Sequence, residues 1–247
     1  DVYKRQIQFV DSSDRQAVTD LIKMNGLVDV VIPRGGAGLI QAVVQNATVP
    51  VIETGIGVCH TYVDAGADYD MARAIAINAK VQRPAVCNAM ETLLVHEDAA
   101  AEFLPQMLTE YFAAGVTIIG CGKTQAFDKR IQAATEADWA TEYGDLRLSV
   151  KIVSGLEEAL AHIAKYGTKH SECIVTSDYN HARTFQQRVD AAAVYVNAST
   201  RFTDGFEFGF GAEIGISTQK LHARGPMALP ELTSSKYLIS GDGQIRG

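Results

Sequence analysis

The sequence lacks the features that would tie it to nucleic acid or to a membrane. It has no basic stripe and carries a net charge of −7, so we expect no nucleic-acid partner, because nothing is available to neutralise phosphates. No apolar run reaches the ~18 residues that a membrane-spanning helix needs. We see no charged-then-apolar leader, so we expect neither export nor insertion into a membrane.

Cysteine is scarce and its spacing follows no pattern. The four cysteines are Cys59, Cys87, Cys121 and Cys173. Their wide, irregular spacing favours neither a disulfide framework nor a zinc site, so we expect no metal. A reducing, cytoplasmic compartment is the simplest interpretation, and thiol chemistry would then be catalytic rather than structural.

An initiator methionine is also missing. Asp1 to Arg5 lead at once into a strand-like run at 6–10. We expect either a chain that begins in the middle of a fold or a cloning remnant followed by a fragment. The 247 residues, 47% of them hydrophobic, can still bury a substantial core in one large or two modest domains.

Apolar runs of strand length alternate with helix-like segments along most of the chain. The first 55 residues predict strands at 7–10, 28–32 and 49–53 with helices between them, and hence βαβ units with a parallel sheet. The remainder predicts a second α/β block. Its expected strands are 60–63, 92–95, 116–119, 148–153, 174–176 and 194–196, and its expected helices are 68–82, 98–113, 155–166 and 178–188.

Two segments near the C-terminus do not follow this alternation. Residues 205–225 are glycine-rich and predict irregular structure. Residues 235–239 predict an isolated strand, whose unpaired edges would favour pairing with another sheet.

Cys87 is the first candidate for chemistry. It lies in the run QRPAVCNA at 82–89. A free cysteine is usually a small buried hydrophobe, but a thiolate can also attack an electrophilic carbonyl. A turn at Arg83 and a helix start at Asn88 would supply positive charge and free backbone N–H groups, which lower a thiol pKa and stabilise an oxyanion.

Two further motifs precede Cys87 in the chain. Glu53 ends a predicted strand and is either a solvated carboxylate or a base for the thiol. The glycines at 35, 36 and 38 follow another predicted strand and open a helix. That arrangement is compatible with a dinucleotide phosphate at a helix N-terminus, although the spacing is not G-x-G-x-x-G and glycine-rich turns are common.

Together these motifs resemble the aldehyde dehydrogenase superfamily, and most closely its γ-glutamyl phosphate reductases (glutamate-5-semialdehyde dehydrogenases). The resemblance runs from about Gln8 to Arg246 and includes a signature-like stretch at 153–174. It implies an aldehyde-dehydrogenase-like α/β fold in three parts: a truncated C-terminal part of a Rossmann-type NADP-binding domain at 1–55, a catalytic domain at 56–225 and a C-terminal oligomerisation strand within 226–247.

The resemblance also implies three groups of site residues. The catalytic group is Cys87 as nucleophile with Glu53 and Asn88. The cofactor-binding group is Arg34, Gly35, Gly36 and Glu142. The substrate-binding group, which would hold a phosphate and a carboxylate, is Arg83, Ser199, Thr200 and Arg201. The run at 53–57 departs from the superfamily's Glu-x-Gly-Gly, so Glu53 is expected only to tune the thiol, and Arg83 could equally be structural.

The implied reaction is NADPH-dependent reduction of L-glutamate 5-phosphate to L-glutamate 5-semialdehyde with release of phosphate, a step of proline biosynthesis. NADP over NAD is inferred from the family alone. The implied partners are a second copy of the chain, bound through the C-terminal strand, and glutamate 5-kinase. Two alternatives stay open: a general NAD(P)-dependent aldehyde dehydrogenase, and a truncated inactive chain that still oligomerises.

Overall fold

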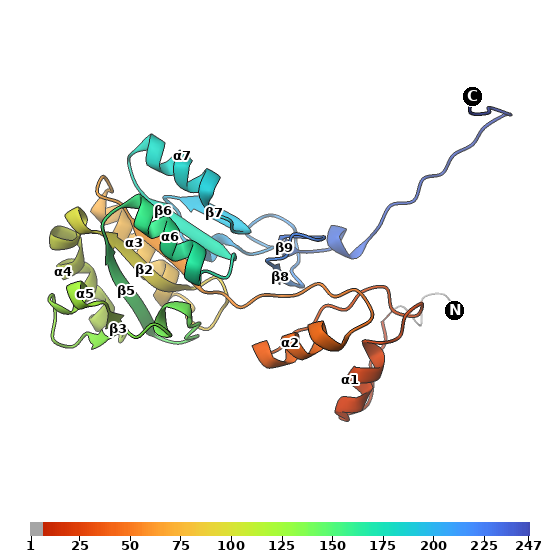
Figure 1. Cartoon of the computed structure of the whole chain (residues 1–247), viewed down its shortest axis with the longest axis horizontal. Helices are drawn as coiled ribbons and strands as arrows, with labels where there is room; N and C mark the ends of the chain where they lie inside the picture. Colours follow the sequence, from red (N-terminus) through yellow and green to blue (C-terminus); the bar gives the residue numbers. More distant parts are fainter. Residues whose placement is uncertain (1–6) are drawn as a thin grey trace.

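A seven-stranded sheet organises the structure, a computed structural model that describes residues 7–247. Asp1 to Arg5, and the expected strand start at Gln6, lie outside the described residues. Every pair of neighbouring strands in this sheet is parallel, in the order β4-β3-β5-β2-β1-β6-β7 (Figure 1). The strands are β1 (Cys59–Val63), β2 (Met90–His96), β3 (Thr117–Gly120), β4 (Gln132–Ala133), β5 (Arg147–Val153), β6 (Ser171–Val175) and β7 (Ala193–Val196). The expected parallel α/β architecture of this block is confirmed.

Helices cover both faces of the sheet because successive strand residues point to opposite sides. Leu93 and Val95 of β2 pack into one apolar cluster with helices on that face, whereas Leu94 packs into a second cluster on the other. The first face carries α3 (Tyr69–Val81) and α4 (Glu97–Ala113), and the second carries α6 (Leu156–Tyr166) and α7 (Tyr179–Arg188), with short α5 (Gly122–Gln125) and η1 (Asp138–Ala140) beyond β3. All four expected helices of this block form. Within residues 7–247, no helix is both long and apolar enough to cross a membrane.

The N-terminal segment forms its helices but not its sheet. It contains α1 (Arg15–Leu21) and α2 (Ala37–Asn46), which lie apart from the main sheet in Figure 1. The three strands expected at 7–10, 28–32 and 49–53 reduce to a single parallel bridge between Val31 and Val51. Strand formation depends on pairing with neighbouring strands in a sheet, and Ile7, in the first of these runs, is 94% exposed.

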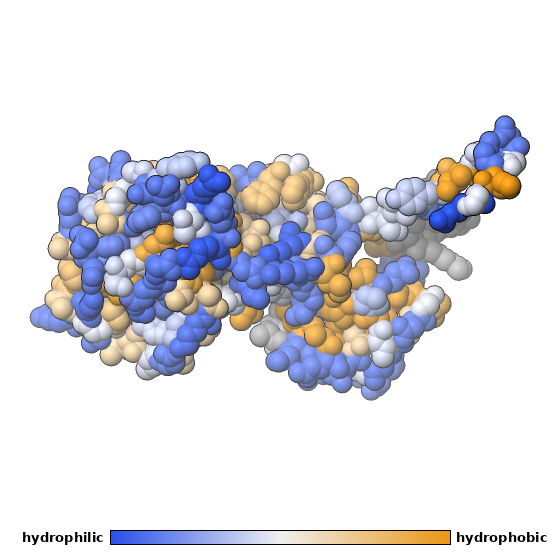
Figure 2. All heavy atoms as spheres, turned by 45° about the horizontal axis from the view of Figure 1, so that its top comes forward, coloured by the Kyte–Doolittle hydropathy of each residue, from blue (hydrophilic) through white to orange (hydrophobic). Residues whose placement is uncertain are grey.

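The C-terminal segment also differs from the expectation. Within the glycine-rich region, β8 (Gly215–Ser217) and β9 (Gly225–Met227) form an antiparallel pair that the sequence did not predict. After η3 (Pro230–Leu232) the chain leaves the body as an extended tail. Residues 235–239 form no strand, and Tyr237 to Ile239 are exposed apolar residues. Figure 2 shows hydrophobic residues on this tail.

The loops that lead into the strands lie at the same end of the sheet, where the strands begin. Gly57 precedes β1, Cys87 precedes β2, Glu142 precedes β5 and His170 precedes β6. Since these strands are parallel, the residues gather at the amino ends of the strands. The candidate site therefore lies opposite the carboxyl edge at which open α/β sheets usually bind ligands.

Candidate active site

A cavity of about 540 Å³ opens beside Cys87. It collects candidate residues from four separate parts of the chain: Arg34, Gly35, Gly36, Arg83, Cys87, Asn88, Glu142 and Arg201. Two carboxylates that the sequence did not single out, Asp204 and Glu213, also line it. Glu213 belongs to the glycine-rich region and Asp204 directly precedes it, and no motif marked either residue.

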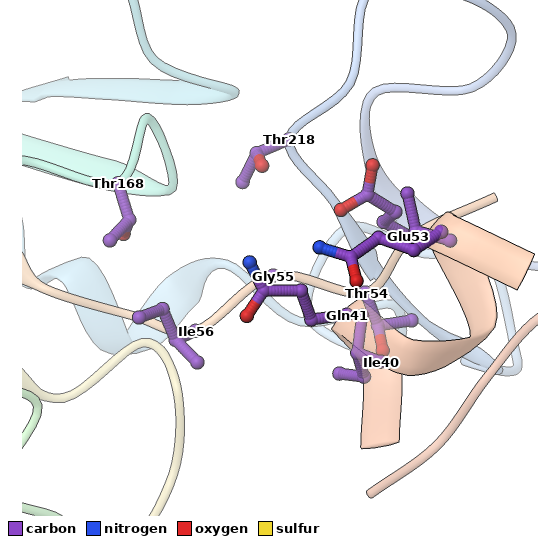
Figure 3. Close-up of a pocket in the computed structure, with 10 residues that line it drawn as sticks. Ile40, Gln41, Glu53, Thr54, Gly55, Ile56, Thr168 and Thr218 are labelled. Carbon is purple, nitrogen blue, oxygen red and sulfur yellow. The ribbon is translucent and has the colours of Figure 1, made fainter. Parts of the chain in front are cut away.

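Glu53 lies in an adjoining cavity rather than with Cys87. This second cavity, of about 420 Å³, shares Ile40, Gly55 and its neighbours with the first and is seen in Figure 3. Gln219 holds the Glu53 carboxylate by donating from Nε2 to Oε1 at 2.8 Å, and its own Oε1 accepts from the Glu53 N–H at 2.9 Å. The expected partnership between Glu53 and the thiol is therefore not formed here, because Gln219 has taken the carboxylate.

The electrostatic setting of Cys87 is opposite to the expectation. Burial raises the pKa of the Cys87 thiol to about 11, and the carboxylates of Glu142 and Glu213 add to the rise, while Arg34 opposes it. The helix expected to begin at Asn88 is a turn instead, so no helix N-terminus stabilises a thiolate. At this pKa the Cys87 thiol is protonated near neutral pH.

Neither Ser199 nor Thr200 lines the cavity, and Thr200 contacts the loop at 82–89 that carries Cys87. The Thr200 hydroxyl donates to the backbone oxygen of Asn88 at 2.8 Å, and Thr200 is fully buried. Ser199 caps η2 (Thr200–Phe202) by accepting from the Arg201 N–H at 3.3 Å. Both side chains thus form hydrogen bonds within the protein, and their role as hydroxyl donors to substrate stays a prediction.

Two arginines make one side of the cavity cationic. The Arg201 guanidinium is held by the Asn88 side-chain oxygen and, through Nε, by Gln82 Oε1 at 2.9 Å. Burial lowers the pKa of Arg201, and the neighbouring Arg83 lowers it further. Two cations that disfavour each other's charge are relieved by an anion between them, so this side of the cavity suits a carboxylate or phosphate.

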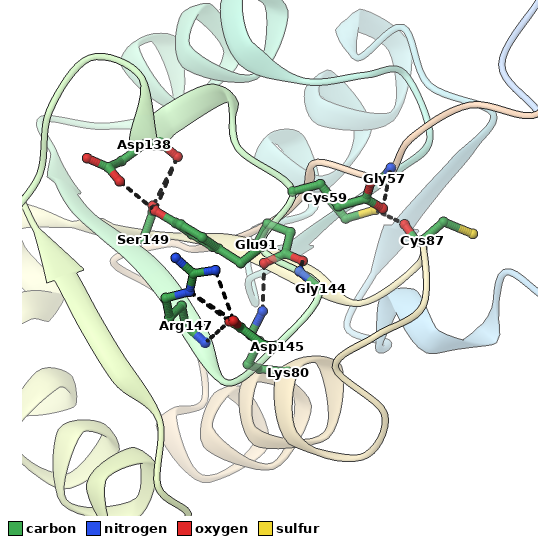
Figure 4. A network of polar contacts seen from close by, with 12 residues as sticks. Gly57, Cys59, Lys80, Cys87, Glu91, Asp138, Gly144, Asp145, Arg147 and Ser149 are labelled. Carbon is green, nitrogen blue, oxygen red and sulfur yellow. Dashed lines mark hydrogen bonds and ion pairs between the residues drawn. The ribbon is translucent and has the colours of Figure 1, made fainter. Parts of the chain in front are cut away.

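Glu142 is held in place by a buried support. Its Oε1 accepts from the Gly57 N–H at 2.9 Å. Behind it, Lys80 Nζ lies 2.6 Å from Glu91 Oε2, and Glu91 Oε1 accepts from the Gly144 N–H at 3.2 Å (Figure 4). Burial raises the pKa of Glu91 to about 7, against the opposing effect of Lys80. The buried pair thus fixes the loop from which Glu142 projects.

The signature-like stretch at 167–172 lies directly against the entry to β1. Thr168 Oγ1 accepts from the Val58 N–H at 3.0 Å, and Glu172 Oε2 accepts from the His60 N–H at 2.8 Å. His162 packs edge-on against His60 and against the rings of Trp139 and Tyr166, and burial lowers its pKa to about 3. Within residues 7–247, no cluster of His, Cys, Asp and Glu is arranged to hold a metal ion.

Comparison with known proteins gives this cavity a context. No family model matches the chain. A γ-glutamyl phosphate reductase from Moorella thermoacetica is 65% identical over 240 residues, which make up 97% of this chain and 57% of that protein. The chain is homologous to the γ-glutamyl phosphate reductases. It spans a little over half the length of the curated reductases that it matches.

Solved structures agree with this relationship. The crystal structure of the reductase from Thermotoga maritima superposes with a TM-score of 0.94 at 53% identity, over 97% of this chain and 58% of that chain. An acetylating aldehyde dehydrogenase from Geobacillus thermoglucosidasius superposes with a TM-score of 0.60 at 19% identity, over 76% of this chain and 50% of that chain. The second likeness shows a shared fold, and the fold class predicted from the sequence is confirmed.

Proposed function

We propose that the chain carries the thiol-dependent half of a γ-glutamyl phosphate reductase, with Cys87 as the nucleophile that accepts the γ-glutamyl group of L-glutamate 5-phosphate. The observation that carries the proposal is the placement of a thiol beside two arginines in one cavity of a chain 65% identical to a reductase. Arg201 and Arg83 are the side chains suited to a substrate that bears one carboxylate and one phosphate.

The acyl transfer balances without any further reactant. The Cys87 thiol gives up its proton, and the sulfur adds to the acyl carbon to form a tetrahedral oxyanion. The bond from that carbon to the phosphate oxygen then breaks, the carbonyl re-forms and a thioester remains on Cys87. The proton given up by the thiol leaves on the departing phosphate, which is released as hydrogen phosphate. Arg83 is the proposed contact of the departing phosphate, and Arg201 that of the α-carboxylate.

The residues beside the cavity fit a nicotinamide cofactor. Gly36 caps the N-terminus of α2, where backbone N–H groups are free, and a Cβ at Gly36 would meet only open space. Such a site accepts a pyrophosphate, with Arg34 and Gly35 beside it and Glu142 across the cavity as the proposed ribose contact. NADPH bound there would supply the hydride that converts the thioester into the aldehyde. The choice of NADPH over NADH follows the family expectation.

The remaining expectations belong to the same proposal. We divide the chain into a cofactor-domain remnant at 1–55, a catalytic part at 56–225 and an oligomerisation segment at 226–247. A second copy of the chain and glutamate 5-kinase are the proposed partners, the step serves proline biosynthesis, and the compartment is cytoplasmic. Oxidation of a free aldehyde is less well supported, because that reaction needs a base to activate water and Gln219 holds Glu53.

The proposal is tested by acylation of the chain itself. Incubation with L-glutamate 5-phosphate, freshly made by a kinase, should add one γ-glutamyl group to Cys87, detected by intact mass and peptide mapping. Hydroxylamine should remove it, as expected of a thioester. Cys87→Ser should take up no label, and Cys121→Ser should label normally. Label on another residue, or equal labelling of Cys87→Ser, would reject Cys87 as nucleophile.

A further inference from the structure

Two buried side chains hold the two peptides that follow Cys87 in the chain. The Cys59 thiol donates to the Cys87 carbonyl oxygen at 3.2 Å, and the Thr200 hydroxyl donates to the Asn88 carbonyl oxygen at 2.8 Å. Cys59 and Thr200 are both fully buried. The Ala89 N–H closes the turn by donating to the Val86 carbonyl oxygen at 2.9 Å. The backbone around Cys87 therefore has little rotational freedom.

The Cys59 thiol has one proton to give, and the surrounding contacts decide where it goes. The other candidate acceptor, His170 Nδ1, is 3.8 Å from the Cys59 sulfur and is already 2.8 Å from the Ser171 hydroxyl. The Cys87 carbonyl is the nearer acceptor. Burial raises the pKa of Cys59 well above its ordinary value, so the proton stays on the sulfur.

Because a peptide is planar, the hydrogen bond to the Cys87 carbonyl also fixes the direction of the Asn88 N–H. The described residues contain no cis peptide bond, so the Asn88 N–H points opposite to the Cys87 carbonyl, with which it shares a planar peptide. Figure 4 shows the Cys87 carbonyl turned toward Cys59 and the Cys87 sulfur on the other side. Across residues 7–247, no protein group accepts a hydrogen bond from the Asn88 N–H.

We propose that Cys59 is a positioning residue for acyl transfer: by holding the Cys87 carbonyl, its thiol turns the Asn88 N–H toward the acyl group on Cys87, where this N–H stabilises the oxyanion. The inference rests on the proposed function, because it requires an acyl group on Cys87. The inference gives Cys59 a role in the reaction and makes the Asn88 N–H a hydrogen-bond donor to the oxyanion. The side chain of Asn88 is already hydrogen-bonded to Arg201 and Thr203.

Two reactions of the Cys87 sulfur can distinguish a positioning role of Cys59 from a role in packing alone. Acylation by a p-nitrophenyl ester forms a tetrahedral oxyanion before p-nitrophenolate leaves, whereas alkylation by iodoacetamide displaces iodide and forms none. Both reactions require the thiolate, so the ratio of their rates cancels any change in the pKa of Cys87. Removing one oxyanion donor typically costs ~10²–10³ in rate, and partial misorientation should cost about tenfold.

The variants are Cys59→Ser, which keeps a donor, and Cys59→Ala and Cys59→Val, which do not. We expect the two donor-free variants to lose about tenfold or more in the acylation-to-alkylation ratio, and Cys59→Ser to restore it to within about twofold of the unmodified chain. Cys59→Val fills the space of the thiol, so it keeps the test informative if Cys59→Ala unfolds.

The outcomes separate the inference from the proposed function. An unchanged ratio in a folded Cys59→Val chain would overturn the role of Cys59, as would a parallel fall of both rates that leaves the ratio constant. Failure of the unmodified chain to be acylated at Cys87 while iodoacetamide still reacts there would instead overturn the proposed function.

Discussion

A Cβ atom added to Gly57 would fall 1.5 Å from the carbonyl oxygen of Cys87. No side chain can be accommodated at that separation. Only glycine at position 57 therefore lets the segment that leads into β1 pass so close to the loop at 82–89 that carries Cys87. Gly57 is also the residue whose N–H holds Glu142. The backbone at Gly57 therefore affects the position of the Cys87 loop and also the position of the Glu142 carboxylate.

Replacing Gly57 with alanine should displace the nucleophile loop. We expect Gly57→Ala to lower the free energy of unfolding by about 1–3 kcal/mol, the usual cost of overpacking, and to reduce acylation of Cys87 by more than tenfold. Urea denaturation and intact-mass labelling measure the two effects. Gly66→Ala is the matched control, since a Cβ there meets only open space. Equal behaviour of the two variants would contradict the close contact.

The pH dependence of Cys87 alkylation should show a protonated resting thiol. With a pKa of about 11, the thiolate fraction rises about tenfold for each pH unit between 7 and 10, so the iodoacetamide rate should rise likewise without a plateau. Glu142→Gln removes a negative charge that raises this pKa, and should speed alkylation at fixed pH.

Glu53→Gln is the control for that experiment, because Gln219 holds Glu53 outside the Cys87 cavity. Its alkylation profile should match that of the unmodified chain. A plateau near pH 8 in the unmodified chain would contradict the raised pKa of Cys87. Acceleration by Glu53→Gln equal to that of Glu142→Gln would show that Glu53 also acts on the thiol.

The buried ion pair of Lys80 and Glu91 should be costly to break from one side. Lys80→Met leaves an uncompensated buried carboxylate, and we expect a loss of about 3–5 kcal/mol in the free energy of unfolding. The double variant Lys80→Met with Glu91→Leu should recover most of that loss while leaving the Gly144 N–H without its acceptor. Denaturant titration of both variants makes the comparison; a double variant less stable than Lys80→Met would contradict it.

The extended tail should govern assembly and not folding. Ending the chain after Thr233 removes exposed apolar residues that do not pack on the sheet. We expect its molar mass in solution, measured by light scattering, to fall to that of one chain, with an unchanged melting temperature. Tyr237→Asp in the full-length tail should act in the same direction. A shortened chain that keeps the mass of the full chain would place the contact between copies elsewhere.

The sequence predicted the central strands of the main sheet well because these strands are buried in a sheet that supplies neighbours. The run at 92–95, for example, is the centre of β2, which lies between β1 and β5. The run at 28–32 is equally apolar and forms no strand, because strand formation depends on partners that a local pattern does not specify. The pair of β8 and β9 was missed since its glycines signal irregularity rather than register.

The candidate site was predictable where a residue's own type and motif decide its place, as for Cys87 and Arg201. It was not predictable where a distant partner decides. Glu53 is held by a glutamine 166 positions away in the chain, and Thr200 turns to a backbone oxygen 112 positions away. The predicted direction of the Cys87 pKa shift was wrong for the same reason, because burial, Glu142 and Glu213 outweigh the effect of Arg34.

The orientation of the parallel sheet has one more consequence for Cys87. Each helix that follows a strand begins at the carboxyl end of the strands and runs back toward their amino end. In this way α3 ends at Val81, just before the loop at 82–89 that carries Cys87. A helix C-terminus carries about half a negative charge through its macrodipole, which disfavours an anion beside it. Susceptibility of a cysteine to oxidation follows its thiolate character. Burial raises the pKa of Cys87 to about 11, and the direction of the strands acts in the same sense, so Cys87 is held in the thiol form that oxidants attack least.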